Sequence, residues 1–418
     1  MSGKNRKIVM IVAVAVAALV LGGAYIWYSG NYAGRNRVTL SQTARADNEW
    51  RNVASSNGIV GDYLWSRTTE LMIKNSSDGV MIPSTYMIEG RLTSEPAVSS
   101  EEYLLFDQAL LLKNYVRRGD RFSAAALKDR VNEVLISEDQ DDLSLCEWLD
   151  AYLEYYSSYG SKSDYNRIVE IAGMIFDSDG NMRQEQLSIA SFIAGDYYSL
   201  ADESGNTGVL STIEQGNGED PEESVERVTI TGIRLAAIDL KLIRDLEDNG
   251  IIPEGTFDRY CEIAEGGRVS DGVPYYAYAF YYSSEGNIEY VSSFDVPAAV
   301  STTESLLTLT HLTEVGRGDH DIYSNVKNLV INGMAYQDTY YIISRSMGGD
   351  EDLGVYAQIM QLALVSDDID LYDRASARVG FRIATYSSSP ALYMVYRAVD
   401  DRFVFDAREN LTVSLSVN

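Results

Sequence analysis

The residues with the clearest chemical potential are carboxylates that stand beside predicted helices. Glu101 and Glu102 precede an apolar run, and Asp142 follows Asp141 at the start of another. Cleavage between two sugars needs a protonated carboxyl group for the leaving oxygen and a second carboxylate that activates water or attacks the sugar. Flat aromatic faces bind sugar rings, and the chain has 30 tyrosines. These residue types favour carboxylate chemistry on a polysaccharide.

The chain has few residues that could support other kinds of chemistry. Its only histidines are His311 and His320, which argues against a zinc site built from histidines and against a Ser-His-Asp triad. Cys146 and Cys261 are far apart and lack CxxC spacing, so two buried free thiols are favoured over a disulfide. We therefore expect neither a metal nor a cofactor.

Each candidate also has a purely structural interpretation. Glu101 and Glu102 follow two serines, so they could be first-turn acids of a helix that serine caps. Asp141 and Asp142 likewise precede an apolar run, where the helix dipole favours acids. In an acidic protein, Arg234 could be a salt-bridge partner and not a sugar ligand. The sequence leaves both interpretations open.

Helical periodicity dominates the chain and predicts the elements that position these residues. The fold class we expect is all-α, an (α/α)6 toroid of about twelve helices in sequential hairpins. An α-solenoid is the alternative, but no fixed-period repeat supports it. The predicted helices span 49–74, 101–117, 122–136, 142–157, 164–176, 184–201, 227–247, 255–265, 301–315, 321–347, 353–366 and 368–379.

Two stretches depart from this periodicity. Residues 202–226 are polar and acidic, which predicts a long loop. Residues 271–298 contain PYYAYAFYY and IEYVSSF, which predict a β-hairpin or an aromatic loop. Because no sharp change of composition divides 47–418, we expect this range to form one domain.

An apolar run near the N-terminus predicts the membrane topology of the chain. Residues 8–28 form an uncharged apolar run that is long enough to span a bilayer as a helix, and three basic residues precede it. Residues 1–7 would then be cytoplasmic, 29–46 a linker, and 47–418 an extracellular domain of a single-pass cell-membrane protein. A cleaved secretory signal is the alternative, although its apolar core is normally shorter.

The net charge of −28 restricts the partners. Such a surface repels nucleic acid and anionic lipid, so we expect contact with a membrane only through the N-terminal helix. Two explanations of the acidic charge are open: the host lives in high salt, or the surface is acidic for solubility alone. A polysaccharide remains the expected partner, and the oligomeric state is not predicted.

Three ordered motifs resemble glycoside hydrolase family 8. The first runs from Val98 through Glu101-Glu102-Tyr-Leu-Leu-Phe to Phe122 and is similar to the family's helix that begins with the acid. The second, Asp141-Asp142-Leu-Ser-Leu-Cys-Glu-Trp, is similar to its sugar-binding aspartate helix. The third, Ile230-Thr-Gly-Ile-Arg234, resembles its Tyr-Asp-Ala-x-Arg step. Together they extend over roughly 55–380.

The resemblance implies an inverting endo-β-glycanase with the toroid fold. It places the general acid at Glu101 or Glu102, the residue that orients the sugar at Asp142, and Arg234 in the groove. The aromatic residues expected to bind the substrate are Tyr103, Trp148, Tyr275 and Tyr276.

The chain departs from the family pattern in two places. Leu104, Leu105 and Phe106 replace polar or small residues after the acid, and Thr231 stands where the family has an aspartate. The replacement bases that the sequence offers are Asp196, Asp239 and Asp271. Without such a base, the domain would be an inactive carbohydrate-binding protein or a structural ectodomain of the cell surface.

Overall fold

The computed structural model describes residues 20, 22–23, 38–41, 59–94, 98–137, 139–190, 227–270, 272–292, 299–342 and 344–417. Most of the predicted membrane helix 8–28 and of the linker 29–46 lies outside the described residues, as do the loop 202–226, Asp196 and Asp271. Among the residues that are described, no helix has both the length and the apolar character needed to cross a membrane.

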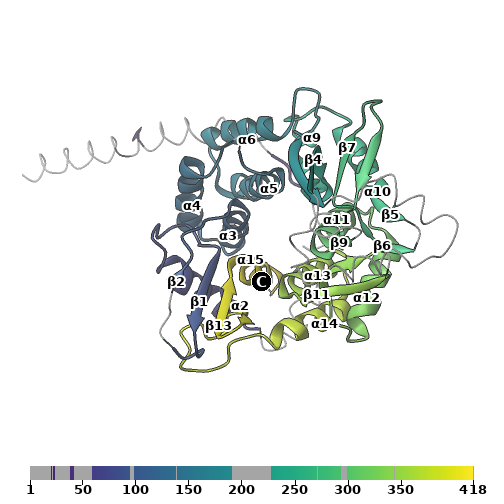
Figure 1. The fold of residues 1–418 in the computed structure, drawn as a ribbon. Coiled ribbons are helices and arrows are strands. Elements are labelled where there is room, and N and C mark those ends of the chain that lie inside the picture. Colours follow the sequence, from purple (N-terminus) through teal and green to yellow (C-terminus); the bar gives the residue numbers. More distant parts are fainter. Residues whose placement is uncertain are drawn as a thin grey trace, which may run out of the picture.

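Six helices form an inner ring in which each packs against the next (Figure 1). α15 packs in turn against α3, so the ring is closed. These helices are buried over most of their length; in α3, every residue from Leu105 to Tyr115 is buried. The inner helices are α3 (Leu105–Arg117), α5 (Asp142–Tyr159), α9 (Leu240–Asp248), α11 (Thr302–Glu314), α13 (Leu353–Val365) and α15 (Ala407–Val417).

Six further helices alternate with these along the chain and lie outside them. They bury one face only: α14 buries Leu371, Tyr372, Ala375 and Val379, the spacing of an amphipathic helix. The first and last helices, α2 and α15, form the sixth pair. The outer helices are α2 (Gly61–Thr68), α4 (Arg121–Val134), α6 (Lys162–Ile175), α10 (Thr256–Gly266), α12 (His320–Ile331) and α14 (Ile369–Gly380).

The described residues thus contain twelve helices in the arrangement of an (α/α)6 toroid, although α15 was not among the predicted helices, and short strands correct the all-α expectation. Four antiparallel sheets have the orders β12-β13-β1-β2, β11-β10-β9, β3-β4-β7-β8 and β5-β6. The strands are β1 (Thr85–Glu89), β2 (Val98–Ser99), β3 (Glu185–Ala190), β4 (Arg227–Arg234), β5 (Arg268–Ser270), β6 (Val273–Tyr276), β7 (Ala279–Tyr282), β8 (Ile288–Val291), β9 (Ala299–Ser301), β10 (Gln337–Tyr341), β11 (Ser346–Glu351), β12 (Arg397–Val399) and β13 (Arg402–Asp406).

Three predicted helices are wrong over part of their length. The described part of 184–201 is strand β3, and 227–247 divides into β4, a 3-10 turn at Leu235–Ala237 and α9. The predicted helix 321–347 ends at Ile331, and strands β10 and β11 follow it. The expected hairpin within 271–298 is confirmed, since β7 pairs with β8.

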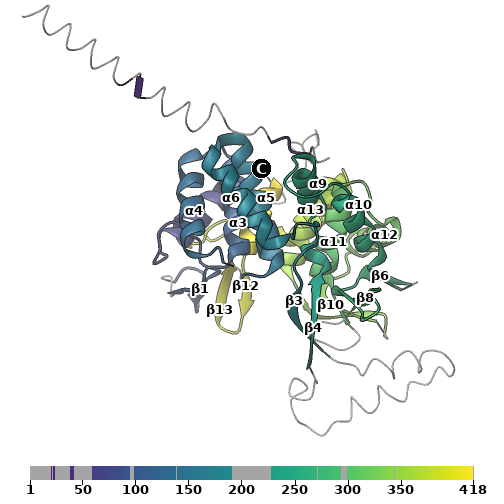
Figure 2. The same ribbon diagram turned by 90° about the horizontal axis from the view of Figure 1, so that it is seen from above.

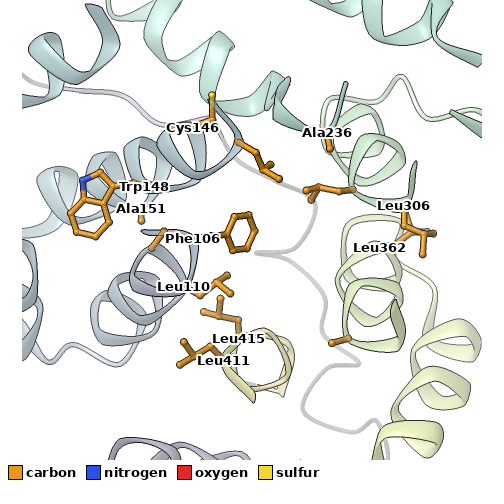
Figure 3. Packing of buried hydrophobic residues seen from close by; sticks show 14 of the residues in the cluster. Phe106, Leu110, Cys146, Trp148, Ala151, Ala236, Leu306, Leu362, Leu411 and Leu415 are labelled. Carbon is orange, nitrogen blue, oxygen red and sulfur yellow. The ribbon is translucent and has the colours of Figure 1, made fainter. Parts of the chain in front are cut away.

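One continuous hydrophobic core joins the inner helices. Figure 3 shows Phe106 and Leu110 of α3 beside Leu411 and Leu415 of α15, while Trp148 points to the other side of α5. Cys146 and Cys261 are both buried free thiols, as expected.

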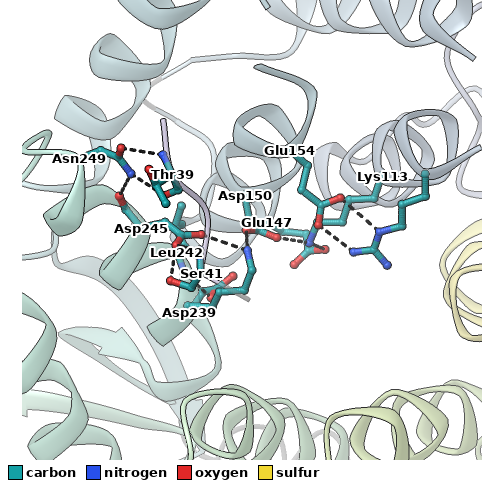
Figure 4. A network of polar contacts seen from close by, with 12 residues as sticks. Thr39, Ser41, Lys113, Glu147, Asp150, Glu154, Asp239, Leu242, Asp245 and Asn249 are labelled. Carbon is teal, nitrogen blue, oxygen red and sulfur yellow. Dashed lines mark hydrogen bonds and ion pairs between the residues drawn. The ribbon is translucent and has the colours of Figure 1, made fainter. Parts of the chain in front are cut away.

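Charged side chains are also buried between the inner helices (Figure 4). Lys113 of α3 contacts Glu147 at 2.6 Å and Asp150 at 2.8 Å, both on α5. Lys241 of α9 contacts Asp150 at 2.8 Å and Asp245 at 3.3 Å. A buried charge is tolerated only when it is paired, and these cations and carboxylates satisfy one another.

Candidate active site

The N-terminal ends of the inner helices come together at one end of the toroid and carry most of the candidate chemistry. We call this set the acidic belt: Asp107 of α3, Asp141 and Asp142 at the start of α5, Glu304 of α11, Asp352 before α13, Asp406 and Glu409 around the start of α15, and Glu185 of β3. Helix N-termini favour negative charge. Three arginines, Arg183, Arg234 and Arg408, lie among these acids.

Arg234 contacts three carboxylates of the belt. Its Nη2 donates a short hydrogen bond to Oδ1 of Asp141, and its Nε donates to Oε1 of Glu185 at 3.1 Å. Its Nη1 lies 3.6 Å from Oε1 of Glu304. One guanidinium therefore joins carboxylates from α5, β3 and α11, and its planar fork suits such multiple recognition.

Backbone pairing holds Arg234 in place. It ends β4, where it pairs with Ala279 of β7. Gly232, two residues earlier, runs so close to β7 that a Cβ there would lie 2.6 Å from the carbonyl oxygen of Phe280. The absence of a side chain at residue 232 thus allows the strand contact that positions the guanidinium.

The pKa values of Asp141 and Glu304 are shifted in opposite directions. Burial acts to raise the pKa of Asp141, but the charge of Arg234 and hydrogen bonds with Ser144 hold this pKa below its ordinary value. Burial raises the pKa of Glu304, even though the charges of Arg234 and Arg408 oppose the rise. Opposite pKa shifts in two neighbouring carboxyl groups are the pattern that general base and acid roles require.

Both side chains remain accessible, with 41% of the Asp141 side chain and 22% of the Glu304 side chain exposed. Asp141 also caps α5, since its Oδ1 accepts from the backbone N–H of Ser144 at 3.1 Å. Oε1 of Glu304 faces Arg234, whereas its Oε2 is buried without a hydrogen-bond partner. The second oxygen of Glu304 therefore has no donor that would stabilise its charged form.

Asp142 lies behind this pair and is fully buried. Arg183 contacts its Oδ1 at 2.6 Å, while its Oδ2 is buried with no partner. Burial raises the pKa of Asp142 to about 6, against the charge of Arg183. With no exposed surface, Asp142 acts on neighbouring residues and not directly on a ligand.

The belt continues across α3, α13 and α15. Burial and the nearby Asp406 and Asp352 raise the pKa of Glu409 to about 8, and Oε2 of Glu409 is buried without a partner. Burial, together with the charge of Asp406, raises the pKa of Asp107 well above its ordinary value. At neutral pH Glu409 is therefore mostly protonated, and burial favours the neutral form of Asp107.

The predicted acids Glu101 and Glu102 are exposed in the segment before α3. α3 begins at Leu105 without a side-chain cap, so the serine-capped alternative does not describe them. Oε2 of Glu102 lies 3.4 Å from the hydroxyl of Ser84, and Glu102 interacts electrostatically with Asp107. Glu102 therefore borders the belt. The structural interpretations of Asp141, Asp142 and Arg234 hold, because these residues do begin a helix and form ion pairs.

The predicted aromatic ligands are mostly core residues. The side chains of Trp148, Tyr275 and Tyr276 are at most 2% exposed, so they present no face to a sugar in this structure. Trp148 packs against Tyr152, and Tyr275 packs against Tyr340 with ring centroids 4.6 Å apart.

Tyr103 is half-buried in an open hollow of about 370 Å³ on the outer side of the toroid. Its hydroxyl lies 3.0 Å from that of Ser77 and accepts from the backbone N–H of Asp78 at 3.2 Å. Asp78 in turn pairs with Arg130 at 2.8 Å. These contacts hold the Tyr103 ring in the wall of the hollow.

Two positions tied to the missing family aspartate are also described. The hydroxyl of Thr231 accepts from Gln186 at 2.7 Å on the exposed part of β4. Asp239 is buried as the cap of α9, accepting from the N–H of Leu242 at 2.9 Å. Neither contacts Arg234. Within the described ranges, no group of three or more histidine, cysteine or acidic residues is arranged to hold a metal ion.

Sequence reasoning missed Arg183, Glu185, Glu304 and Glu409. Only Glu304 had a local signature: Ser301-Thr-Thr-Glu304 has the spacing of a capping box, and the Ser301 hydroxyl does accept from the N–H of Glu304 at 3.4 Å. Arg183, Glu185 and Glu409 are brought to the belt by strand pairing or by closure of the ring, and neither can be predicted from the local sequence.

Comparison with solved structures assigns the architecture. The described structure matches a novel alpha-amylase from Clostridium perfringens with a TM-score of 0.58 at 14% identity, covering 84% of this chain and 98% of that one. The chain has the six-hairpin glycosidase fold. PssZ from Listeria monocytogenes matches with a TM-score of 0.51 at 10% identity, covering 91% of this chain and 98% of that one.

A family 8 endo-beta-1,4-glucanase from an Achatina fulica gut metagenomic library gives a TM-score of 0.43 at 8% identity, covering 76% of this chain and 96% of that one. No protein-family model matches the chain, and neither does any curated protein. Identities this low identify the fold alone.

Proposed function

We propose that the protein is a membrane-anchored extracellular glycoside hydrolase that cleaves a polysaccharide by carboxylate acid and base catalysis. The observation that carries the proposal is the pair Asp141 and Glu304, which share Arg234 and have pKa values shifted in opposite directions. The fold supports it, and the apolar run 8–28 supports the anchor.

In this mechanism Glu304 is the general acid and Asp141 is the base that activates water. The sequence resemblance placed the acid at Glu101 or Glu102, but both are exposed and stand apart from Arg234. Arg234 lowers the pKa of Asp141, which favours its ionised form, and burial raises the pKa of Glu304, which favours its protonated form. Asp142 and Arg183 act as positioning residues beneath Asp141. An inverting enzyme holds its carboxyl groups about 6.5–9.5 Å apart to admit water.

The test is release of new reducing ends by the full-length protein in detergent, at low and at high salt. The panel contains β-linked glucans, as the resemblance implies, and α-linked glucans, because one structurally similar protein is named an alpha-amylase. We expect Glu304→Gln and Asp141→Asn each to lower kcat by about 10²–10⁴-fold. The exposed Glu170→Gln on α6 is the matched control, and it should leave kcat unchanged.

A pH profile sharpens the assignment. Activity should rise as Asp141 ionises and should fall as pH rises through the raised pKa of Glu304. If Glu101→Gln or Glu102→Gln abolishes activity while Glu304→Gln does not, the acid is in the loop before α3 and our assignment is wrong.

The second candidate is a carbohydrate-binding protein without activity, and Thr231 at the family's aspartate position favours it. Binding of a glucan without cleavage under any condition would establish this function. If the protein neither binds nor cleaves any glucan, the remaining function is that of a structural ectodomain.

A further inference from the structure

Residues 38–41, which we call the strap, are fixed to the C-terminal end of α9. The N–H of Thr39 donates to Oδ1 of Asn249 at 3.0 Å, and Nδ2 of Asn249 donates back to the carbonyl of Thr39 at 2.9 Å. Two residues on, the N–H of Ser41 donates to Oδ1 of Asp245 at 2.6 Å, and its hydroxyl donates to the same oxygen. The strap is therefore bound through two successive turns of one helix.

These contacts connect the strap to the interior of the toroid. Asp245 is fully buried and also contacts Lys241, whose other partner is Asp150 of α5 (Figure 4). Val38 and Leu40 pack against the hydrophobic core. The strap thus contributes both hydrogen bonds and apolar contacts, and belongs to the domain as much as to the linker.

The strap and the acidic belt lie at opposite ends of the toroid. The belt gathers the N-terminal ends of inner helices, whereas the strap lies at the last turns of α9. Figure 2 shows the segment at α9 on one side of the molecule and strands β3, β4 and β13 on the other. The C-terminus of α15 lies on the same side as the strap.

We propose that the strap holds the domain with the C-terminal ends of its inner helices towards the bilayer, so that the acidic belt opens away from the membrane. The proposal rests on the membrane anchor of the proposed function and not on hydrolysis. Its partner surface is the lipid headgroup layer that surrounds the segment 8–28.

Lengths favour this orientation. Nine residues, 29–37, separate the apolar run from the strap. A chain of that length spans at most about 32 Å. The 18 residues of α5 make a rod of about 27 Å. To turn the belt towards the bilayer, the chain would have to cover the length of that rod, which takes most of its maximum span.

Charge favours the same orientation. The segment 29–37 contains Arg35 and Arg37 and no acidic residue, so it is attracted to anionic headgroups. The belt end is rich in carboxylates, and the chain as a whole carries −28. Arg35 and Arg37 therefore favour a position of the segment next to the strap at the membrane surface.

The experiment measures how close each end lies to the lipid surface. Full-length protein is reconstituted into phosphatidylcholine and phosphatidylglycerol vesicles and labelled with a fluorophore at one introduced cysteine. Asp248→Cys marks the exposed end of α9, and Asp401→Cys marks the exposed turn between β12 and β13. The native cysteines are buried, so labelling targets the new site. Headgroup nitroxide lipids then quench the fluorophore.

We expect several-fold stronger quenching at residue 248 than at residue 401. Asn249→Ala, which removes both bonds to Thr39, should reduce that difference. Asn332→Ala is the matched control, because Asn332 likewise ends a helix, α12, and is exposed. Equal quenching at the two sites, or the reverse order, would overturn the proposal.

Failure of the protein to float with the vesicles would also overturn the proposal, since no anchor would exist. Absence of glucan cleavage would not affect it, so failure of the orientation and failure of the hydrolase function are distinguishable.

Discussion

Arg183 donates two hydrogen bonds to one oxygen of Asp142, from Nε at 3.1 Å and from Nη2 at 2.6 Å. The other oxygen of Asp142 is buried without a partner. This ion pair ties the start of α5 to the segment that leads into β3, so it supports both Asp141 and Glu185 from beneath.

The first prediction concerns this pair. Arg183→Gln should destabilise the fold by about 3 kcal/mol, because it leaves a buried carboxylate unpaired. Asp142→Asn in the same chain should recover part of that loss, since a neutral amide needs no counter-charge. Chemical denaturation of the single and double variants at neutral pH measures the coupling. Strictly additive losses would show that the two side chains do not support each other.

The second prediction is a pH dependence of stability that Glu409 causes. The pKa of this side chain is raised to about 8 in the folded protein, from an ordinary value of 4.5. Its contribution is fully present below about pH 4.5 and is lost as pH rises through 8, on the order of 4 kcal/mol in all. Glu409→Gln should therefore match the parent near pH 5 and exceed its stability near pH 9.

Thermal unfolding at those two pH values is the measurement, with the exposed Glu170→Gln as control. A Glu409→Gln protein that tracks the parent at both values would mean that Glu409 is ionised in the fold.

The third prediction tests the close strand contact beneath Arg234. Gly232→Ala should cost about 1–3 kcal/mol, because its Cβ would lie 2.6 Å from the Phe280 carbonyl oxygen and would part β4 from β7. Gly173→Ala should instead stabilise by about 0.5–1 kcal/mol, since it lies within α6 with open space around its Cβ. Unfolding midpoints that change in the same direction for both variants would contradict this account.

The fourth prediction separates core aromatics from sugar ligands. Trp148→Phe should lower stability by about 1–2 kcal/mol through lost packing, because the side chain is fully buried. The KM for any glucan that the protein cleaves should not change. Parallel denaturation and kinetic measurements decide the matter, and a raised KM at unchanged stability would place this ring in the substrate groove.

Hydrophobic periodicity was sufficient to predict the toroid because it is a local property. Both α5 and α13 begin within one residue of the predicted boundary. Residues 227–234, RVTITGIR, were assigned to a helix although five of the eight are β-branched, a composition that favours a strand. The missed α15 has many polar residues that are buried and hydrogen-bonded: Asn410 bonds to the backbone of Val395, and Ser414 bonds to Asn114 of the adjacent inner helix α3.

The site was predicted only where it coincides with helix starts. Asp141 and Asp142 were found because acids before an apolar run are visible in sequence, and Arg234 because a motif drew attention to it. Glu304 and Glu185 are 163 and 44 positions from Asp141 in the chain, and only ring closure and sheet pairing bring them to Arg234. Trp148, Tyr275 and Tyr276 are buried, because tyrosine and tryptophan fill cores as readily as they bind sugars.

The closing of the ring by α2 and α15 has a consequence for biogenesis. Ser414 of α15 bonds to Asn114 of α3 across 300 positions of the chain, and the sixth hairpin joins the first and last described helices. A chain that emerges N-terminus first exposes the apolar flanks of α3 and α13 until its last dozen residues arrive. Contacts of such long sequence separation form slowly. The half-made ring is therefore the stage at which a chaperone would protect this protein and a protease would remove it.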